Sequence, residues 1–125
     1  GYGVGLDVSR GDLQAQAKAK GQPWDVAKAF DHSAPVSALR PAAAAGIDAG
    51  TVLRLSVNGQ LRQQATLGEM VHGVPQIIAT LSRLFELKAG DLIFTGTPAG
   101  VAALHRGDHF HAELAGVAEL ASRIV

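Results

Sequence analysis

The alternation of apolar and polar side chains predicts an extended segment at the start of the chain. Between residues 2 and 8 every second side chain is apolar, and the positions between hold glycine or aspartate: Tyr2, Val4, Leu6 and Val8 against Gly3, Gly5 and Asp7. A period of two is typical of a strand with one apolar face. The glycines leave the other face nearly bare, so another backbone or a ligand can approach it closely.

A second alternation predicts a hairpin in the middle of the chain. Leu53, Leu55 and Val57 lead up to Asn58-Gly59, and residues 60–64 continue beyond it. Asn-Gly between alternating segments is a strong signal for a two-residue hairpin turn.

Two further strand regions are expected towards the C-terminus. Leu92–Thr95 is predicted to be a short buried strand that enters a Gly-Thr-Pro turn. Asp108–Leu114 and Val117–Val125 are predicted to form an antiparallel pair across Gly116.

Helical periodicity is clearest after Pro75, where apolar residues recur at Ile77, Ile78, Leu81, Leu84 and Phe85. The spacing predicts a helix over Val74–Leu87, closed by Lys88-Ala89-Gly90.

Other helical signals are shorter. Ser9 and Asp12 resemble a capping box that opens a helix running to about Lys18. Trp24–Phe30 is predicted to be irregular or a single turn, and Pro41–Gly50 to be a solvated loop. These elements make a strand-dominated α+β fold without βαβ repeats.

Composition narrows the class of protein. The 125 residues are 47% hydrophobic and 18% charged, and eleven basic side chains balance eleven acidic ones, so neither disorder nor a nucleic-acid partner is expected. The absence of cysteine excludes thiolate metal sites and a Cys nucleophile. No stretch reads as a membrane span or a signal peptide, so the cytoplasm is the expected location. The start in mid-pattern without methionine suggests further residues upstream.

Two charged residues are candidates for chemistry, and each has a plainer alternative. Asp7 lies where a strand hands over to a helix; it suits Mg²⁺ or Mn²⁺ as an oxygen ligand, although spacing alone favours a capping or turn role. Lys28 lies in an otherwise apolar segment. It suits an oxyanion or carboxylate, or it covers apolar surface with its stem while its head reaches water.

Other polar residues carry weaker signals. Gly96 and Thr97 lie in a turn that presents backbone N–H groups and hydroxyls to an anion, although such a turn is usually only a turn. His109 and His111 share one face of a strand, but without a third ligand they are expected to be exposed histidines. The remaining polar residues are expected to have structural roles: Glu69 and His72 near the start of the long helix, and Asp91 and Asp108 in turns.

Taken together, several segments resemble the fumarylacetoacetate hydrolase family, in the family's order and approximate spacing along the whole chain. They are Gly1–Ser9 with Asp12-Leu13-Gln14, Gly21–Trp24 with Ala27–Asp31, Val57-Asn58-Gly59, and Gly90–Val101. The segments 21–24 and 28–35 are most similar to acylpyruvate hydrolases, which include fumarylpyruvate hydrolases.

The resemblance implies a rolled, mostly β fold with a mixed sheet and few helices, in which residues 1–125 form a single catalytic domain that is incomplete at its N-terminus. It implies Mg²⁺ or Mn²⁺ held by three carboxylates, of which Asp7 matches the third. The family's Glu-x-Glu pair and its Glu–His dyad on a mobile lid belong to an upstream region that these residues do not contain.

The resemblance also implies roles for other side chains. Lys28 matches the active-site lysine and Gln14 a residue that lines the substrate pocket. Gly96 and Thr97 belong to the Gly-Thr-Pro loop that contacts substrate oxygens. Many members have arginine where this chain has Gly11, with Arg10 one place earlier, so the resemblance does not carry over a carboxylate-binding arginine.

The implied activity is hydrolysis of a carbon–carbon bond in acylpyruvate-type oxo-acids during aromatic-compound breakdown, by a homodimer. Isomerases and decarboxylases of related oxo-acids share the scaffold, and a non-catalytic scaffold module is the alternative from a different class. The segment alone is expected to bind metal weakly and to turn nothing over.

Overall fold

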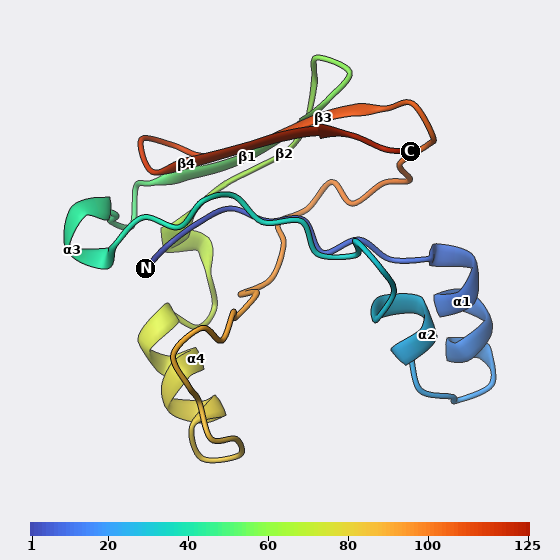
Figure 1. The fold of residues 1–125 in the computed structure, drawn as a ribbon, viewed down its shortest axis with the longest axis horizontal. Coiled ribbons are helices and arrows are strands. Elements are labelled where there is room, and N and C mark those ends of the chain that lie inside the picture. The colour runs from blue at the N-terminus through green and yellow to red at the C-terminus, as the bar shows by residue number, and fades with distance from the viewer.

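A four-stranded antiparallel sheet organises the chain. The computed structural model describes all of residues 1–125 and places the strands in the order β2-β1-β3-β4. They are β1 (Val52–Val57), β2 (Gln60–Thr66), β3 (His109–Leu114) and β4 (Ala118–Arg123). Figure 1 shows the sheet as one layer, with the N-terminal segment running along it and the short helices at the periphery. The α+β fold is confirmed, and every strand pair is antiparallel.

Residues with positive φ close both hairpins where the sequence predicts them. Asn58 has φ 51° and Gly59 φ 77°, the two positive values that a type I′ turn requires. Between β3 and β4, Gly116 has φ 72°. Each of these four strands lies within two residues of its predicted bounds.

The core lies between one face of the sheet and the apolar side of residues 2–8. It consists of Val4, Leu6, Val57, Phe110, Ala112 and Leu114. Burying a side chain of the size of Leu or Phe contributes about 1.5–3 kcal/mol, so this contact fixes the N-terminal segment on the sheet. The predicted apolar face of residues 2–8 is confirmed.

The predicted strand over residues 2–8 is only partly formed. The segment is extended and lies antiparallel to residues 33–40, but it makes two isolated bridges, Tyr2 with Arg40 and Gly5 with Val36. Proline explains one interruption, because the Pro35 carbonyl accepts from Leu6 N–H but Pro35 has no N–H to donate in return. At Val4 the backbone N–H donates to the Ser37 hydroxyl instead of to a carbonyl.

The first helix begins differently from the prediction. α1 spans Gly11–Ala19, and its N-cap is Arg10, with no side-chain capping bond, so the capping box expected from Ser9 is wrong. Arg10 is held on both sides, because its N–H donates to the Ala27 carbonyl and its guanidinium lies 4.6 Å from the centre of the Phe30 ring. These two contacts fix the chain at Arg10, and the helix begins at the next residue, Gly11.

Three other short helices lie outside the sheet. α2 (Asp25–Lys28) is the predicted single turn. α3 (Ala42–Ala45) lies in the segment predicted to be a solvated loop, and it buries Ala45. The helix forms because four consecutive alanines have a high helix propensity. η1 (Leu67–Glu69) is a turn of 3₁₀-helix whose start is capped by Glu69, so the role expected for Glu69 at the next helix is wrong.

The long predicted helix is shorter than its periodicity indicates. α4 spans Val74–Leu81 and ends where Arg83 and Leu84 donate to carbonyls three residues back. Leu84 and Phe85 continue the apolar pattern but are 70% and 62% exposed. Helical stability comes mostly from packing of the apolar face, and here no element covers it. None of these helices is long and apolar enough to cross a membrane.

The predicted strand Leu92–Thr95 does not form. These residues make no backbone hydrogen bond, and Leu92 and Phe94 are 53% and 42% exposed, so the predicted burial is wrong as well. An apolar run specifies a strand only when a neighbouring strand supplies hydrogen-bond partners, and none lies beside this one.

Two turns capped by carboxylates make the stability of the fold depend on pH in the acid range. The Thr66 N–H and hydroxyl donate to Glu69 and lower the pKa of that carboxyl. The His105 N–H and the Asn58 amide likewise lower the pKa of Asp108. A carboxyl whose pKa is lowered in the folded state stabilises the fold above its unfolded pKa, and that contribution is lost as the pH falls through the folded pKa.

We predict that stability decreases as the pH falls below about 4 and that Asp108→Asn weakens this dependence. The free energy of unfolding, measured by urea titration at neutral pH and at about pH 3, should change less with pH in the variant than in the unmodified chain. Asp31→Asn is the matched control, because Asp31 makes no side-chain hydrogen bond or ion pair. An unchanged pH dependence in Asp108→Asn would contradict the prediction.

Candidate functional site

An ion pair joins the two charged residues that the sequence marks as candidates. The Lys28 ammonium donates to the Asp7 carboxylate over 3.0 Å. The Lys28 side chain is 34% exposed and that of Asp7 58%. A solvent-exposed pair of this kind contributes only about 0.2–1 kcal/mol, so the fold does not rest on it. The Lys28 head is thus paired with a carboxylate and still partly exposed to water.

Backbone hydrogen bonds on both sides set the geometry of this pair. Val8 N–H donates to the Ser33 carbonyl over 2.9 Å, and Arg10 N–H donates to the Ala27 carbonyl over 2.9 Å. They tie the chain just after Asp7 to the chain on either side of Lys28. The closeness of the two charges is therefore a property of the backbone.

The glycine-cleared side of the N-terminal segment admits other parts of the chain. A side chain at Gly3 would lie 2.8 Å from Leu39, and one at Gly5 would lie 2.8 Å from the ring of Phe94 and 3.1 Å from the Pro35 carbonyl. Other parts of the chain therefore approach this face closely at Gly3 and Gly5, as predicted. Asp7 is the next side chain on the same face. Figure 1 shows the chain around residue 94, in orange, meeting the N-terminal segment near the middle of the molecule.

The Gly-Thr-Pro turn is attached to β2. The Gln63 amide nitrogen lies 2.8 Å from the Thr97 hydroxyl and 2.8 Å from the Pro98 carbonyl. Gly100 lies so close to the Arg62 carbonyl that no side chain fits there. Gly96 has φ 112° and open space beside it. Thr97 and Gly96 therefore lie in a turn held at Phe94 on one side and at β2 on the other.

Arg10 is the N-cap of α1, and Gln14 lies within that helix. Gln14 is half-buried on α1, which packs against α2, and its side chain makes no hydrogen bond. Arg10 stacks on Phe30 and contacts neither Asp7 nor Lys28. The structure thus brings Asp7 and Lys28 together directly, and it joins neither Gln14 nor Thr97 to them by a hydrogen bond.

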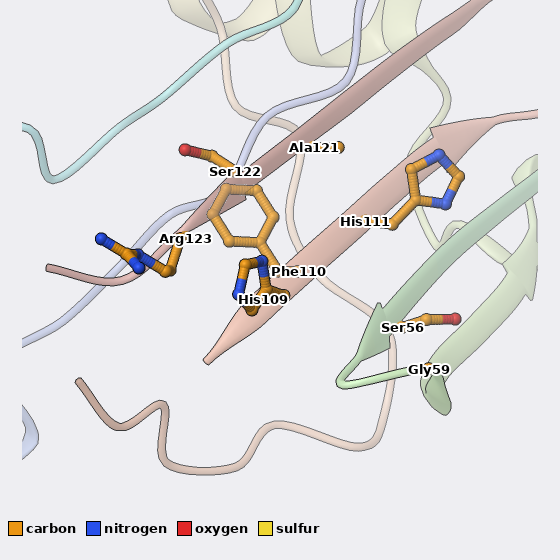
Figure 2. A pocket seen from close by; sticks show the side chains of 8 residues that line it. All are labelled: Ser56, Gly59, His109, Phe110, His111, Ala121, Ser122 and Arg123. Carbon is orange, nitrogen blue, oxygen red and sulfur yellow. The ribbon is translucent and has the colours of Figure 1, made fainter. Parts of the chain in front are cut away.

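The paired histidines line a separate hollow on the outer face of the sheet (Figure 2). His111 has a small neighbour on each adjacent strand, Ser56 and Ala121, which leaves open space above the middle of the sheet. Its ring lies 3.3 Å from Glu119, and Figure 2 shows His109 and Arg123 at one end of the hollow. Both histidines are exposed, as the sequence predicts.

Two expected turn carboxylates have the predicted role. Asp91 accepts from Lys88 N–H over 2.8 Å, and Asp108 accepts from His105 N–H over 2.8 Å.

Asp7 fits a hard divalent cation in its chemistry but supplies one ligand only. Mg²⁺ and Mn²⁺ prefer oxygen donors, and this carboxylate is accessible on the glycine-cleared side. No group of three or more His, Cys, Asp or Glu residues in the chain is placed to hold a metal ion. A complete coordination sphere at Asp7 therefore takes further ligands from substrate, water or other residues.

Comparison with known proteins adds the family context. Residues 1–125 match the model of the fumarylacetoacetate hydrolase C-terminal domain. An oxaloacetate tautomerase of Escherichia coli (strain K12) is 51% identical over 109 residues, which cover 86% of this chain and 50% of the relative. A fumarylpyruvate hydrolase of Ralstonia sp is 40% identical over 120 residues, 96% of this chain and 62% of the relative. The chain thus spans between half and about three fifths of these curated relatives.

Solved structures share the backbone. The fumarylpyruvate hydrolase from Pseudomonas aeruginosa, in complex with Mn²⁺ and pyruvate, superposes with a TM-score of 0.94 at 43% identity, covering 100% of this chain and 54% of that one. A 5-carboxymethyl-2-hydroxymuconate delta-isomerase from Mycobacterium smegmatis has a TM-score of 0.86 at 33% identity, covering 100% and 48%. The same backbone therefore occurs in proteins named for hydrolysis and for isomerisation.

We predict that Gly5→Ala destabilises the fold by about 1–3 kcal/mol, because the added methyl group overlaps the Phe94 ring. The penalty should shrink in a Phe94→Ala background, where only the Pro35 carbonyl still crowds the position. Gly11→Ala is the control, since nothing lies near Gly11. Urea unfolding measures the stability of Gly5→Ala, Phe94→Ala, the double variant and Gly11→Ala. A Gly5→Ala chain as stable as the unmodified one would contradict the close contact of Gly5 with Phe94.

Proposed function

The chain belongs to the fumarylacetoacetate hydrolase family, and on that premise we propose that it supplies part of the active site of a Mg²⁺- or Mn²⁺-dependent hydrolase of acylpyruvate-type oxo-acids. Fumarylpyruvate is the type substrate, and the reaction cleaves a carbon–carbon bond. The observation that carries the proposal is the 3.0 Å pairing of Lys28 with Asp7 on the glycine-cleared side. The Mn²⁺ and pyruvate complex of the Pseudomonas aeruginosa relative supports it.

Each residue has a distinct task in this proposal. Asp7 holds the cation, which when bound polarises the oxygens of the oxo-acid. Lys28 places a positive charge beside that position and offsets negative charge that develops on the attacked carbonyl oxygen. Thr97 and the open backbone at Gly96 donate to substrate oxygens, and Gln14 lines the pocket from α1.

Water adds across the carbon–carbon bond in the overall reaction. Its hydroxyl goes to the acyl carbon and yields a carboxylic acid, while the pyruvate enolate takes a proton at carbon. No histidine or glutamate makes a hydrogen bond or ion pair with the side chain of Asp7 or Lys28. The proposal therefore assigns activation of the water to residues outside 1–125.

Tautomerisation of oxaloacetate is the second candidate. The 51% identity to the Escherichia coli oxaloacetate tautomerase favours it. Both reactions need a cation that binds an α-oxo-acid and groups that stabilise an enolate, so Asp7 and Lys28 serve either one. Decarboxylation of a related oxo-acid needs the same parts. A non-catalytic role as a scaffold module would leave Asp7 and Lys28 without a ligand.

We predict that the complete enzyme consumes fumarylpyruvate faster than it interconverts the enol and keto forms of oxaloacetate. Ultraviolet absorbance follows both reactions, with acetylpyruvate as a second diketo-acid substrate. Faster oxaloacetate tautomerisation, with no carbon–carbon cleavage, would replace hydrolysis by the second candidate. No turnover of any of these substrates, with no Mn²⁺ binding, would support the scaffold reading.

We predict opposite effects of Asp7 and Lys28 on metal binding. Asp7→Asn should weaken Mn²⁺ binding in a calorimetric titration because it removes a charged oxygen ligand. Lys28→Met should strengthen it, because a cation 3.0 Å from that ligand is lost. Lys28→Met should nevertheless lower turnover on the order of 100-fold, the usual effect of removing one preorganised donor.

Asp12→Asn and Lys18→Met are matched controls on α1, since neither side chain contacts the site. Unchanged Mn²⁺ affinity in Asp7→Asn would remove Asp7 from the metal site. Near-normal turnover in Lys28→Met would remove the catalytic role of Lys28.

The homodimer and the cytoplasmic location expected from the sequence belong to the same proposal. Sedimentation of the complete enzyme tests the first, and fractionation of cells that express it tests the second.

A further inference from the structure

Gln63 is the one side chain whose hydrogen bonds join the turn from Thr95 to Gly100 to β2. Its amide nitrogen is within 2.8 Å of both the Thr97 hydroxyl oxygen and the Pro98 carbonyl oxygen. Gln63 is 34 positions from Thr97 and 35 from Pro98 in the chain, so local sequence does not dictate these contacts.

The chemistry of the Pro98 carbonyl fixes the orientation of the Gln63 amide. A carbonyl oxygen only accepts hydrogen bonds, so the group that faces it must be the NH₂ of Gln63 and not its oxygen. The two hydrogens of that NH₂ then serve the Pro98 carbonyl and the Thr97 hydroxyl oxygen, one each. Thr97 is thus an acceptor towards Gln63.

A hydroxyl group that accepts from one neighbour has its own proton free for another. Thr97 is exposed, and its hydroxyl donates to no other protein group. Gly96 beside it is open, and Phe94 at the start of the turn lies against Gly5 in the segment that carries Asp7. The free proton of Thr97 is therefore available on a turn that is packed against that segment.

We propose that Gln63 is a positioning residue that sets the Thr97 hydroxyl as a hydrogen-bond donor to an oxygen of an anionic oxo-acid. This inference rests on the proposed function and adds to it the residue that orients the substrate contact. Gln63 acts through Thr97 and does not itself touch the substrate.

The charge variant Gln63→Glu tests the inference, because it keeps the shape of the side chain and reverses its hydrogen bonding. A carboxylate cannot donate to the Pro98 carbonyl, and it would accept the Thr97 proton that the substrate needs. Gln64→Glu is the matched control on the same strand. Gln64 accepts from Arg54 over 2.9 Å, so a carboxylate there keeps its bond and adds the same charge.

Pyruvate affinity of the complete, Mn²⁺-loaded enzyme is the first readout, with Mn²⁺ affinity measured separately. Gln63→Glu should weaken pyruvate binding on the order of 10-fold or more, the usual effect of losing a hydrogen bond to a charged group. Mn²⁺ affinity should not change, and Gln64→Glu should bind both like the unmodified enzyme.

A double-mutant cycle with Thr97→Val separates positioning from mere attachment of the turn. If Gln63 acts through the Thr97 hydroxyl, Gln63→Glu should have little further effect on pyruvate affinity in the Thr97→Val background. If it only holds the turn through Pro98, its effect should persist in full. A persistent effect, or equal pyruvate affinity in Gln63→Glu and Gln64→Glu, would overturn the inference.

Failure of the proposed function gives a different pattern. If Asp7→Asn weakens Mn²⁺ binding but Gln63→Glu leaves pyruvate affinity unchanged, the positioning role alone is overturned. An enzyme whose pyruvate affinity responds to Gln63→Glu while Asp7→Asn leaves Mn²⁺ binding intact overturns the metal site at Asp7 and leaves the positioning role standing.

Discussion

The alternation of apolar side chains with glycine over residues 2–8 packs this segment between the sheet and other parts of the chain. On one side, Val4 and Leu6 join the core against the sheet. On the other, Gly3 and Gly5 admit residues 35–39 and the Phe94 ring at distances that a side chain would forbid. Because Asp7 continues this second side, one short pattern sets both the attachment of the segment and the position of its carboxylate.

The local electrostatics suit a site that is completed by a cation and an anionic ligand. One carboxylate and one ammonium, both partly exposed, balance each other's charge. A divalent cation at Asp7 would be repelled by Lys28, so it needs further negative ligands. An oxo-acid bound to that cation would bring negative charge towards Lys28 and towards the donors at Gly96 and Thr97. For the proposed function, this arrangement would favour metal and oxo-acid together over metal alone.

Local sequence predicted those parts whose structure is decided by neighbours in the chain. Asn58-Gly59 fixed the first hairpin because only a few residue types accept two positive φ values. The alternation of β3 placed Phe110 and Ala112 inside and both histidines outside. Asp7 and Lys28 were each predicted as candidates from their context and from the family resemblance.

Other features depend on residues far apart in the chain, and local patterns misjudged them. Leu84 and Phe85 extend a helical pattern, but α4 ends at Leu81 because nothing packs on that side. Leu92–Thr95 reads as a strand, but no strand lies beside it. The Lys28–Asp7 pair and the Gln63–Thr97 bond span 21 and 34 positions, and no period or motif indicates either one.

A crystal structure of the complete enzyme with Mn²⁺, analysed by the anomalous scattering of manganese, tests whether Asp7 holds the cation. We expect a manganese peak about 2.0–2.3 Å from an Asp7 carboxylate oxygen, the bond length of a small hard cation to oxygen. We also expect the Lys28 ammonium to stay beside that carboxylate without binding the metal. A manganese peak elsewhere, with Asp7 bonded only to Lys28, would remove Asp7 from the metal site.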